Sequence, residues 1–301
     1  MSLILSSNTE DGSSFGSCGT SFPSNACFNI KSTISTPLLK NKIESDSKNM
    51  HDHFSTIASK YQSVRTLDTE PIIHIKDKLK EKSKINMADI GCGDGRYSLE
   101  FLKSFDDSFY IHCVDYNENM LKSLEANLTE QNIINFCTRH GDANRLPLDS
   151  KSIDCIVTFN AIHHFDVPKF LSESLRSLKD DGHIFIYTRL RNQNSKSIWG
   201  EHFPLFTEME KRLYEIDELK QHIQNADMKI HSTKVFEYPR ISSLDRLVHQ
   251  AQTNHYSTFA LYNKVTFEES LKTFKENIKN NFNDLEKIKW TDENILVEIR
   301  T

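Results

Sequence analysis

Three glycines at alternate positions end an apolar run, and this feature constrains the chain more than any other. The run and its turn read M-A-D-I-G-C-G-D-G-R over residues 87–96, and a helical pattern follows over residues 97–102. Glycine is needed where the backbone turns with positive φ or approaches a ligand closely. A helix that starts directly after such a turn presents unpaired N–H groups to polar ligand atoms. The segment therefore predicts a strand, a ligand-binding loop and a helix in succession.

Four further apolar runs follow the loop and alternate with helical patterns. The runs cover residues 109–114, 133–140, 153–159 and 182–188. Between them, residues 119–130 and 168–178 space their apolar side chains three and four positions apart, as amphipathic helices do. Strands that alternate with helices predict an α/β fold with a doubly wound, mostly parallel sheet.

Polar residues stand at or just after the ends of four of these expected strands. They are Asp89, Asp115, Asp142 and Asn160. Ligands of doubly wound sheets bind at the carboxyl ends of the strands, where all four side chains would lie. An acidic residue about 20 positions beyond a glycine loop, as Asp115 is, suits hydrogen bonds to ribose hydroxyls.

These motifs, in this order, resemble the class I S-adenosylmethionine-dependent methyltransferases. The first motif is D-I-G-C-G-D-G, the second is V-D-Y-N-E-N-M-L, and G-D-A-N-R-L-P-L-D-S-K-S-I-D-C-I-V is similar to the third and fourth. The A-I-H-H-F segment that follows is common in small-molecule members, such as those of ubiquinone and menaquinone biosynthesis. The resemblance covers residues 52–188. It implies a seven-stranded Rossmann-like sheet whose last strand is antiparallel and lies beside the fifth.

The resemblance implies S-adenosyl-L-methionine as the cofactor and assigns a set of residues to each part of it. It assigns Asp89, Gly91, Gly93 and Gly95 to the methionine portion, Asp115 to the ribose, and Met120, Asp142 and Ala143 to the adenine. Asn160, just after the fourth strand, is expected to bond the methionine end. An NAD-dependent dehydrogenase is the nearest competitor, but it favours G-x-G-x-x-G, whereas this loop reads G-x-G-x-G.

Two adjacent histidines are the candidate catalytic residues. Methyl transfer depends chiefly on positioning, and a base is needed only if the acceptor arrives protonated. His163 and His164 follow the fourth strand, and histidine titrates near neutral pH, so either is a candidate base. The alternative is that one of them packs in the loop beneath the cofactor.

Two arginines after the fifth strand predict how the acceptor is held. Arg189 and Arg191 leave the strand on the same rim, where a guanidinium pair would bind a carboxylate or phosphate. The alternative is a pair of solvated or salt-bridged loop arginines. Trp199, His255 and Tyr256 are further candidates for the acceptor pocket, with packing as their alternative role. The sequence contains no metal-ligand motif.

The ends of the chain differ in composition from its middle. Residues 1–48 are rich in Ser, Asn and Thr without periodicity and predict a disordered tail, so the methyltransferase domain would span residues 49–301. Helical patterns are expected over residues 54–61 and 71–79. A sixth strand is expected over residues 228–238 and a seventh over residues 294–299, with residues 242–289 inserted between them as a helical cap over the cofactor mouth.

Composition narrows the class of partner. The 301 residues carry a net charge of −5, which argues against a strongly electrostatic nucleic-acid binder. Six cysteines without a C-x-x-C pair fit a reducing compartment, and no apolar run approaches the ~20 residues of a membrane span. A cytoplasmic protein without a membrane partner is expected, and its oligomeric state stays open.

Three functions follow in order of preference. The first is a methyltransferase that acts on a small molecule with an anionic group. The second is a tRNA methyltransferase of the wobble-uridine type, because those enzymes share the A-I-H-H-F motif and a helical start. The third is a cofactor-binding regulatory protein without turnover. The acceptor atom, which is oxygen, nitrogen, carbon or sulfur in different members of this fold, is left open.

Overall fold

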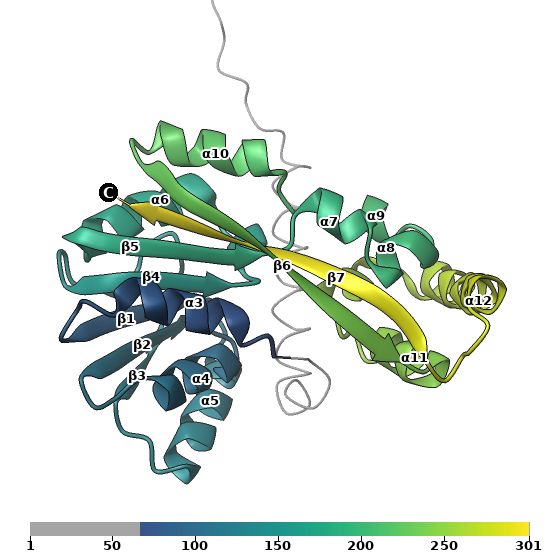
Figure 1. Cartoon of the computed structure of the whole chain (residues 1–301), viewed down its shortest axis with the longest axis horizontal. Helices are drawn as coiled ribbons and strands as arrows, with labels where there is room; N and C mark the ends of the chain where they lie inside the picture. The colour runs from purple at the N-terminus through teal and green to yellow at the C-terminus, as the bar shows by residue number, and fades with distance from the viewer. Residues whose placement is uncertain (1–66, 301) are drawn as a thin grey trace, which may run out of the picture. The chain divides into compact units, whose positions relative to one another are not determined.

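A seven-stranded sheet organises the computed structural model, which describes residues 67–300 (Figure 1). The strands lie in the order β3-β2-β1-β4-β5-β7-β6. Their bounds are β1 (Ile85–Ile90), β2 (Phe109–Asp115), β3 (Phe136–His140), β4 (Ile153–Phe159), β5 (Leu178–Thr188), β6 (Lys229–Ser242) and β7 (Ile288–Arg300). The first five pair in parallel, and β7 is antiparallel to both β5 and β6. The expected seven-stranded α/β sheet is confirmed.

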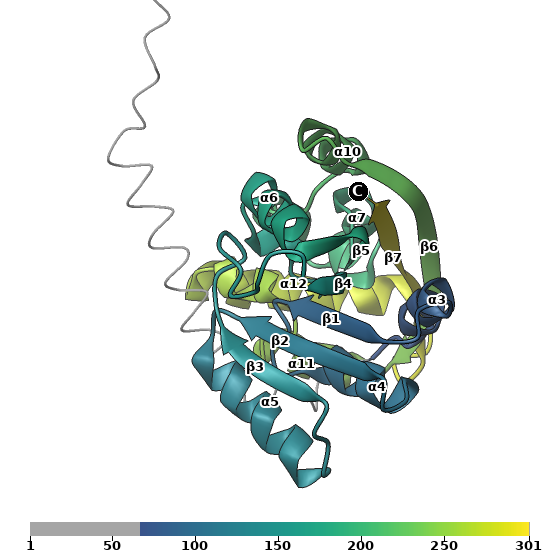
Figure 2. The ribbon, with the colours of Figure 1, turned by 90° about the vertical axis from the view of Figure 1, so that its left-hand side faces the viewer.

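Helices cover both faces of the sheet (Figure 2). On one face, α3 (Glu70–Leu79), α4 (Arg96–Ser104) and α5 (Glu118–Glu130) bury apolar side chains against β1, β2 and β5. On the other face, α6 (Val167–Ser177) and α10 (Ile216–Asn225) form a second core. The sheet therefore has no solvated face along its central strands, which explains why their sequences read as continuous apolar runs.

Local signals fix where the helices that flank the site begin. The Asn117 side chain accepts hydrogen bonds from the backbone N–H groups of Asn119 and Met120, which caps α5. Gly95 has φ +81° and directly precedes α4, so the turn after β1 ends in a left-handed residue. The sequence patterns predicted α5 and α6 to within one residue at each end.

The pair β6–β7 is longer than the sheet that it joins. The two strands pair from Lys229↔Arg300 to Ser242↔Ile288, whereas β5 pairs with β7 only as far as Thr188↔Ile295. The remaining part of the pair forms a two-stranded ribbon, made of residues 236–242 and 288–294, that leaves the sheet (Figure 1). The sequence predicted a shorter β7, residues 294–299, because the ribbon half reads I-K-W-T-D-E without an apolar run.

A group of helices extends from this ribbon. The loop between β6 and β7 contains α11 (Leu244–Gln252), η3 (Ser257–Leu261) and α12 (Lys264–Asn281), so the expected helical insertion is present. Three short helices after β5 join it: α7 (Arg191–Ser195), α8 (Ile198–His202) and α9 (Phe206–Met209). We call residues 191–209 and 243–287 the helical region.

The helical region has an apolar core of its own. Trp199 of α8 stacks on Phe274 of α12 with ring centroids 5.1 Å apart and meets Phe259 edge to face. Phe203 and Phe206 pack into the same cluster. The segment of short helices after β5 thus supplies four of the twelve buried residues of this core, Ile198, Trp199, Phe203 and Phe206.

The expected tail at residues 1–48 and the expected helix over residues 54–61 lie outside the described residues. Within residues 67–300, no helix has the length and apolar character required to cross a bilayer.

Candidate functional site

The glycine loop between β1 and α4 lies at the carboxyl edge of the sheet. Gly91, Gly93 and Gly95 all have positive φ, at +72°, +57° and +81°. A Cβ on Gly91 would lie 2.6 Å from the Ala161 side chain, and one on Gly95 would lie 2.4 Å from Leu124. Apart from Gly93 itself and its two chain neighbours, no atom of the described residues lies within 4 Å of the Cβ position of Gly93. Two of the glycines are therefore required by packing, and the middle one leaves its side of the loop open to a ligand.

Asp89, at the end of β1, is a fully buried carboxyl group beside this loop. One of its oxygens, Oδ2, accepts a hydrogen bond from the Ser98 hydroxyl at 2.6 Å, and the other, Oδ1, has no hydrogen-bond partner among residues 67–300. The pKa of Asp89 is raised to about 7, chiefly by burial; the Ser98 hydrogen bond opposes the rise, and the nearby charge of Asp115 contributes to it. The fold thus holds a carboxyl that titrates near neutral pH under the loop.

Asp115 ends β2 and faces the same loop. Its carboxylate accepts hydrogen bonds from the backbone N–H groups of Gly93 and Asn117, both at 2.8 Å. Burial raises the pKa of Asp115, which these hydrogen bonds oppose. The backbone N–H of Tyr116 is a third donor to this carboxylate, which has about four acceptor positions, so acceptor capacity remains for a hydroxyl donor. Asp115 joins the glycine loop to the start of α5 and keeps acceptor capacity at the sheet edge.

The turn after β3 lies next to Asp115. The backbone N–H of Gly141 donates to the Asp115 carbonyl at 3.1 Å, which places Asp142 and Ala143 beside the end of β2. Asp142 is exposed and Ala143 is buried. Met120, in the first turn of α5, is buried as well. The structure therefore brings the sequence-predicted residues for the three parts of the cofactor to one edge of the sheet.

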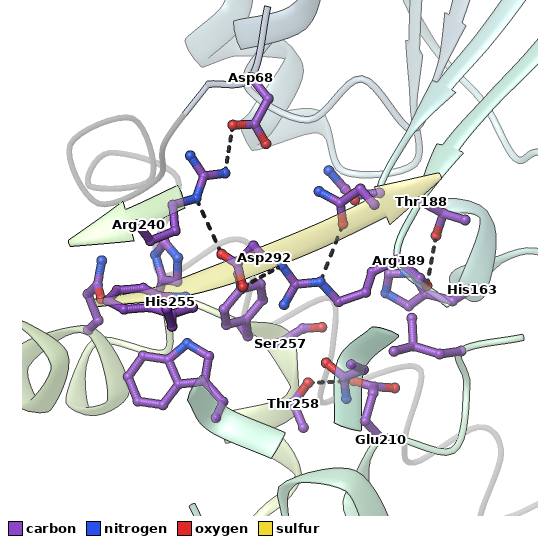
Figure 3. A pocket seen from close by; sticks show the side chains of 18 of the residues that line it. Asp68, His163, Thr188, Arg189, Glu210, Arg240, His255, Ser257, Thr258 and Asp292 are labelled. Carbon is purple, nitrogen blue, oxygen red and sulfur yellow. Dashed lines mark hydrogen bonds and ion pairs between the residues drawn. The ribbon is translucent and has the colours of Figure 1, made fainter. Parts of the chain in front are cut away.

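A cavity of about 210 Å³ opens beside the glycine loop (Figure 3). The ends of β4 and β5 contribute Asn160, His163, His164 and Thr188 to its wall. His163 and His164 lie in the short helix η2 (Ile162–His164), with ring centroids 4.1 Å apart. Both candidate bases thus lie at the end of the cavity that adjoins the carboxyl ends of the strands.

One face of the ribbon forms another part of the cavity wall. Directly opposed residues of an antiparallel pair share a face, and so do alternate residues of one strand. Arg240 pairs with Trp290, and the alternation adds Ser242, Asp292 and Asn294 to the same face. All five residues line the cavity. The sequence W-T-D-E-N contains this alternation of inward residues, which could have been recognised as a strand signal.

A chain of buried ion pairs crosses the cavity from Asp68 through Arg240 and Asp292 to Arg189, and we call it the ion ladder. Arg240 donates to Asp68 from Nη2 at 2.6 Å and to Asp292 from Nε at 3.4 Å. Arg189 Nη2 lies 3.1 Å from Asp292 Oδ1, and Arg189 Nε donates to Asn294 Oδ1 at 3.3 Å. The two arginines and two aspartates balance in charge, and Figure 3 shows them side by side across the cavity.

The two arginines expected to form a pair point to different places. Arg189 lines the cavity and packs over the Tyr256 ring, 5.5 Å from its centroid. Arg191 does not line this cavity; it donates to the Leu213 carbonyl at 2.8 Å and to Glu218 at 3.0 Å. The expectation of a guanidinium pair on one rim is therefore wrong for Arg191. It fails because α7 begins at Arg191 and turns its side chain toward the start of α10.

The other predicted pocket residues divide between lining and packing. His255 and Tyr256 line the cavity. Trp199 also borders it, but most of its surface is buried in the core of the helical region. Sequence reasoning missed Asp68, Arg240 and Asp292, because only the folded chain brings them together.

Comparisons with known proteins agree with this geometry. Residues 88–186 match a protein family described as a methyltransferase domain. A stretch of 171 residues is 28% identical to the tRNA (carboxymethyluridine(34)-5-O)-methyltransferase of Mus musculus, and it covers 54% of this chain and 24% of that protein. A stretch of 144 residues is 29% identical to the demethylmenaquinone methyltransferase of Desulfitobacterium hafniense (strain Y51), covering 45% and 56%. The chain therefore spans less than two thirds of the length of these curated relatives.

The fold is also similar to a solved structure. The crystal structure of the YcgJ protein of Bacillus subtilis matches with a TM-score of 0.56 and 17% sequence identity, over 78% of this chain and 100% of that one. The sheet order and the glycine loop agree with the family match over residues 88–186. Together they confirm the resemblance of the sequence to the class I S-adenosylmethionine-dependent methyltransferases.

The residues at the sheet edge fit the cofactor of this family, S-adenosylmethionine. The open side of Gly93 leaves room for a ligand close to the backbone. Asp115 offers the acceptor positions that a ribose needs. The unpartnered Oδ1 of Asp89 is a buried acceptor directly beneath the loop.

Proposed function

We propose that this protein transfers a methyl group from S-adenosylmethionine to a small molecule that has an anionic group. The observation that carries the proposal is the polar cavity, which opens next to the glycine loop and is lined by Arg246, an arginine that no carboxylate among residues 67–300 pairs with. An apolar quinone tail would have to displace water from these charged groups without replacing its hydrogen bonds, which is costly. A small polar acceptor fits such a wall better.

The proposed cofactor-binding roles are those that the resemblance implies, and the geometry at the sheet edge supports them. The bound cofactor supplies an activated methyl group on a sulfonium. Asp115 accepts the ribose hydroxyls, while Asp89 and the Gly91–Gly95 loop hold the methionine portion. Met120, Asp142 and Ala143 surround the adenine, and Asn160 bonds the methionine end from the end of the neighbouring strand β4.

His163 and His164 are the candidates for removing a proton from the acceptor. Both line the cavity at the end nearest the glycine loop. A neutral imidazole there accepts a proton from a hydroxyl, amine or thiol as the methyl is transferred. The helical region covers the cavity from the other side and excludes water from the reaction.

Isothermal titration with S-adenosylmethionine tests the cofactor assignment. The Asp115→Ala variant should bind the cofactor at least about tenfold more weakly, because charged hydrogen bonds to the ribose are lost. Asp107→Ala, which removes an exposed carboxylate before β2, is the matched control and should bind as the wild type does. Folded wild-type protein that does not bind the cofactor would contradict the proposed function.

Turnover is tested separately from binding. We expect S-adenosylhomocysteine to accumulate when the protein is incubated with the cofactor and a metabolite extract. Labelled methyl donor then identifies the product and the acceptor atom. Binding of the cofactor without any product from such extracts would instead support the non-catalytic regulatory alternative.

A tRNA substrate is the second candidate, favoured by the 171-residue similarity to the mouse tRNA methyltransferase. A nucleic-acid substrate brings many phosphate contacts, and its affinity falls steeply with salt. Filter binding to bulk tRNA at low and moderate salt distinguishes the two candidates. Tight, salt-dependent binding would favour tRNA over a small molecule.

A further inference from the structure

The cavity has two chemically different ends. His163 lies at one end, at the carboxyl edge of the sheet, and His255 lies on the opposite side in Figure 3, with Asp292 and Arg189 between them. Ile295 is the last residue of β7 that pairs with β5 before the ribbon leaves the sheet. Trp290 lies five positions further along β7, which corresponds to about 17 Å of extended strand. An acceptor that spans the cavity therefore meets different side chains at each end.

The charged side chains in the middle of the cavity are paired, so their charges cancel. Arg189 and Arg240 are balanced by Asp68 and Asp292 within the ladder. Glu210, the third carboxylate in the wall, is paired with Arg212. These groups therefore hold one another, and they do not discriminate between an anionic and a neutral ligand by charge.

The far end, under α11, contains donors that lack acceptors. Arg246 lines the cavity from the first turn of α11, and no carboxylate among residues 67–300 pairs with it. Among residues 67–300, the buried indole Nε1 of Trp290 and the buried hydroxyl of Ser242 have no hydrogen-bond partner. Trp290 and Ser242 are diagonal neighbours on the inner face of the ribbon. An indole N–H only donates, and a buried donor without an acceptor is costly.

Gln250 completes this end. It follows Arg246 by four positions, so both side chains leave the same face of α11, and both line the cavity. The far end thus combines one unpaired positive charge with neutral donors on two elements. An oxyanion is the ligand group that matches this set.

We propose that the far end binds the carboxylate of the methyl acceptor, with Arg246 as the charged contact and Trp290 and Ser242 as neutral donors. The inference rests on the proposed methyltransferase function for the identity of the ligand. The acceptor is then an elongated small acid, whose carboxylate lies under α11 and whose methylated atom lies beside His163. Arg246 therefore decides which acceptors bind.

The test measures binding without turnover, in protein saturated with S-adenosylhomocysteine. Calorimetric titrations compare three probes: cinnamate, the neutral cinnamamide and phenyl phosphate. We expect cinnamate to bind at millimolar concentration and cinnamamide to bind at least about tenfold more weakly, as the loss of a charged hydrogen bond predicts. If phenyl phosphate binds more tightly than cinnamate, the site prefers a phosphate to a carboxylate, and the proposal of a carboxylic acid acceptor is overturned.

Variants locate the effect at Arg246. Arg246→Gln should weaken cinnamate about tenfold and leave cinnamamide unchanged, and Arg246→Lys should recover part of the loss. Lys272→Gln, which removes an exposed charge from α12 of the same helical region, is the matched control for long-range electrostatics. Equal binding of acid and amide, no binding of cinnamate, or no effect of Arg246→Gln overturns the inference.

The cofactor titration separates this inference from the proposed function. If the protein binds cinnamate through Arg246 but does not bind S-adenosylhomocysteine, the anion site is supported and the proposed methyltransferase function is contradicted. If the protein binds S-adenosylhomocysteine but shows none of the Arg246 effects, the proposed function still stands and the anion site is contradicted. An Arg246→Gln variant that weakens only tRNA binding would assign the arginine to a nucleic-acid phosphate.

Discussion

Asp89 is a single residue whose protonation is linked to folding. Its pKa rises from 3.8 to about 7 in the folded chain because the carboxyl is fully buried. A raised pKa means that the folded state favours the protonated form. The contribution of Asp89 to stability is therefore complete below the unfolded pKa and is lost as the pH rises through about 7.

Denaturant unfolding at a series of pH values tests this linkage. Relative to Asp89→Asn, the wild type should lose free energy of unfolding as the pH rises from about 4 to about 7, by at most about 1.4 kcal/mol per pH unit. The uncharged amide removes the titration and keeps the size of the side chain. Parallel stability curves for the two proteins would show that the carboxyl is not perturbed.

Residues of the cofactor edge could be predicted because their signals are local. The glycines, Asp89 and Asp115 stand in short motifs whose backbone requirements are visible in the sequence itself. The acceptor side could not be predicted in the same way, because its contacts are remote. Asp68 and Arg240, for example, are hydrogen-bonded across 172 positions. The prediction that Arg191 binds the acceptor beside Arg189 was wrong because Arg191 pairs with Glu218 of α10. The pattern of strands in the sequence does not show where α10 lies.

At the scale of elements, Trp199 joins α8 to α12 and should act through packing. Trp199→Ala should destabilise the protein by roughly 3–5 kcal/mol, because a large core side chain leaves a cavity. S-adenosylmethionine affinity should stay unchanged, since the glycine loop is in another core. Urea unfolding and cofactor titration measure the two effects. Trp199→Phe keeps most of the packing and is the control. If Trp199→Ala retains full stability, the packing role is contradicted and lining the acceptor pocket is the role that is left for Trp199.

Elements with a regular apolar pattern could be predicted, and elements defined by their partners could not. The five parallel strands and α5 followed from periodicity. The outer half of β7 did not, because the ribbon buries only one face, and in β7 that face mixes the apolar Ile288 and Trp290 with the polar Asp292 and Asn294. The helices α7, α8 and α9 are too short for a period of 3.6 residues to be recognised.

At the scale of the whole described chain, the ion ladder holds distant segments together. It joins Asp68, just before α3, to Arg189 after β5 and to Arg240 and Asp292 on the ribbon. Removing one member of a buried pair leaves the other charge unpaired, whereas an apolar replacement of both is tolerated.

A double-mutant cycle at Arg189 and Asp292 tests the ladder. Arg189→Met or Asp292→Leu alone should cost roughly 3–5 kcal/mol of unfolding free energy, and the double variant should cost less than the sum of the two. The exposed pair Lys80–Asp77 is the control, and its loss should cost about 0–1 kcal/mol. Additive losses at Arg189 and Asp292 would show that the two side chains do not interact.

On the ribbon, which side chains reach the acceptor cavity depends on whether they are an even or an odd number of positions apart along the strand. Arg240, Ser242, Trp290 and Asp292 reach the cavity because each is an even number of positions from the next along its strand. One inserted or deleted residue in either strand between the sheet and the cavity would turn that strand's members of the set outward, whereas a change of two would move them along by about 7 Å and keep them facing inward. Redesign or evolution of the specificity of this protein should therefore proceed through even steps in β6 and β7, with the cofactor edge left intact.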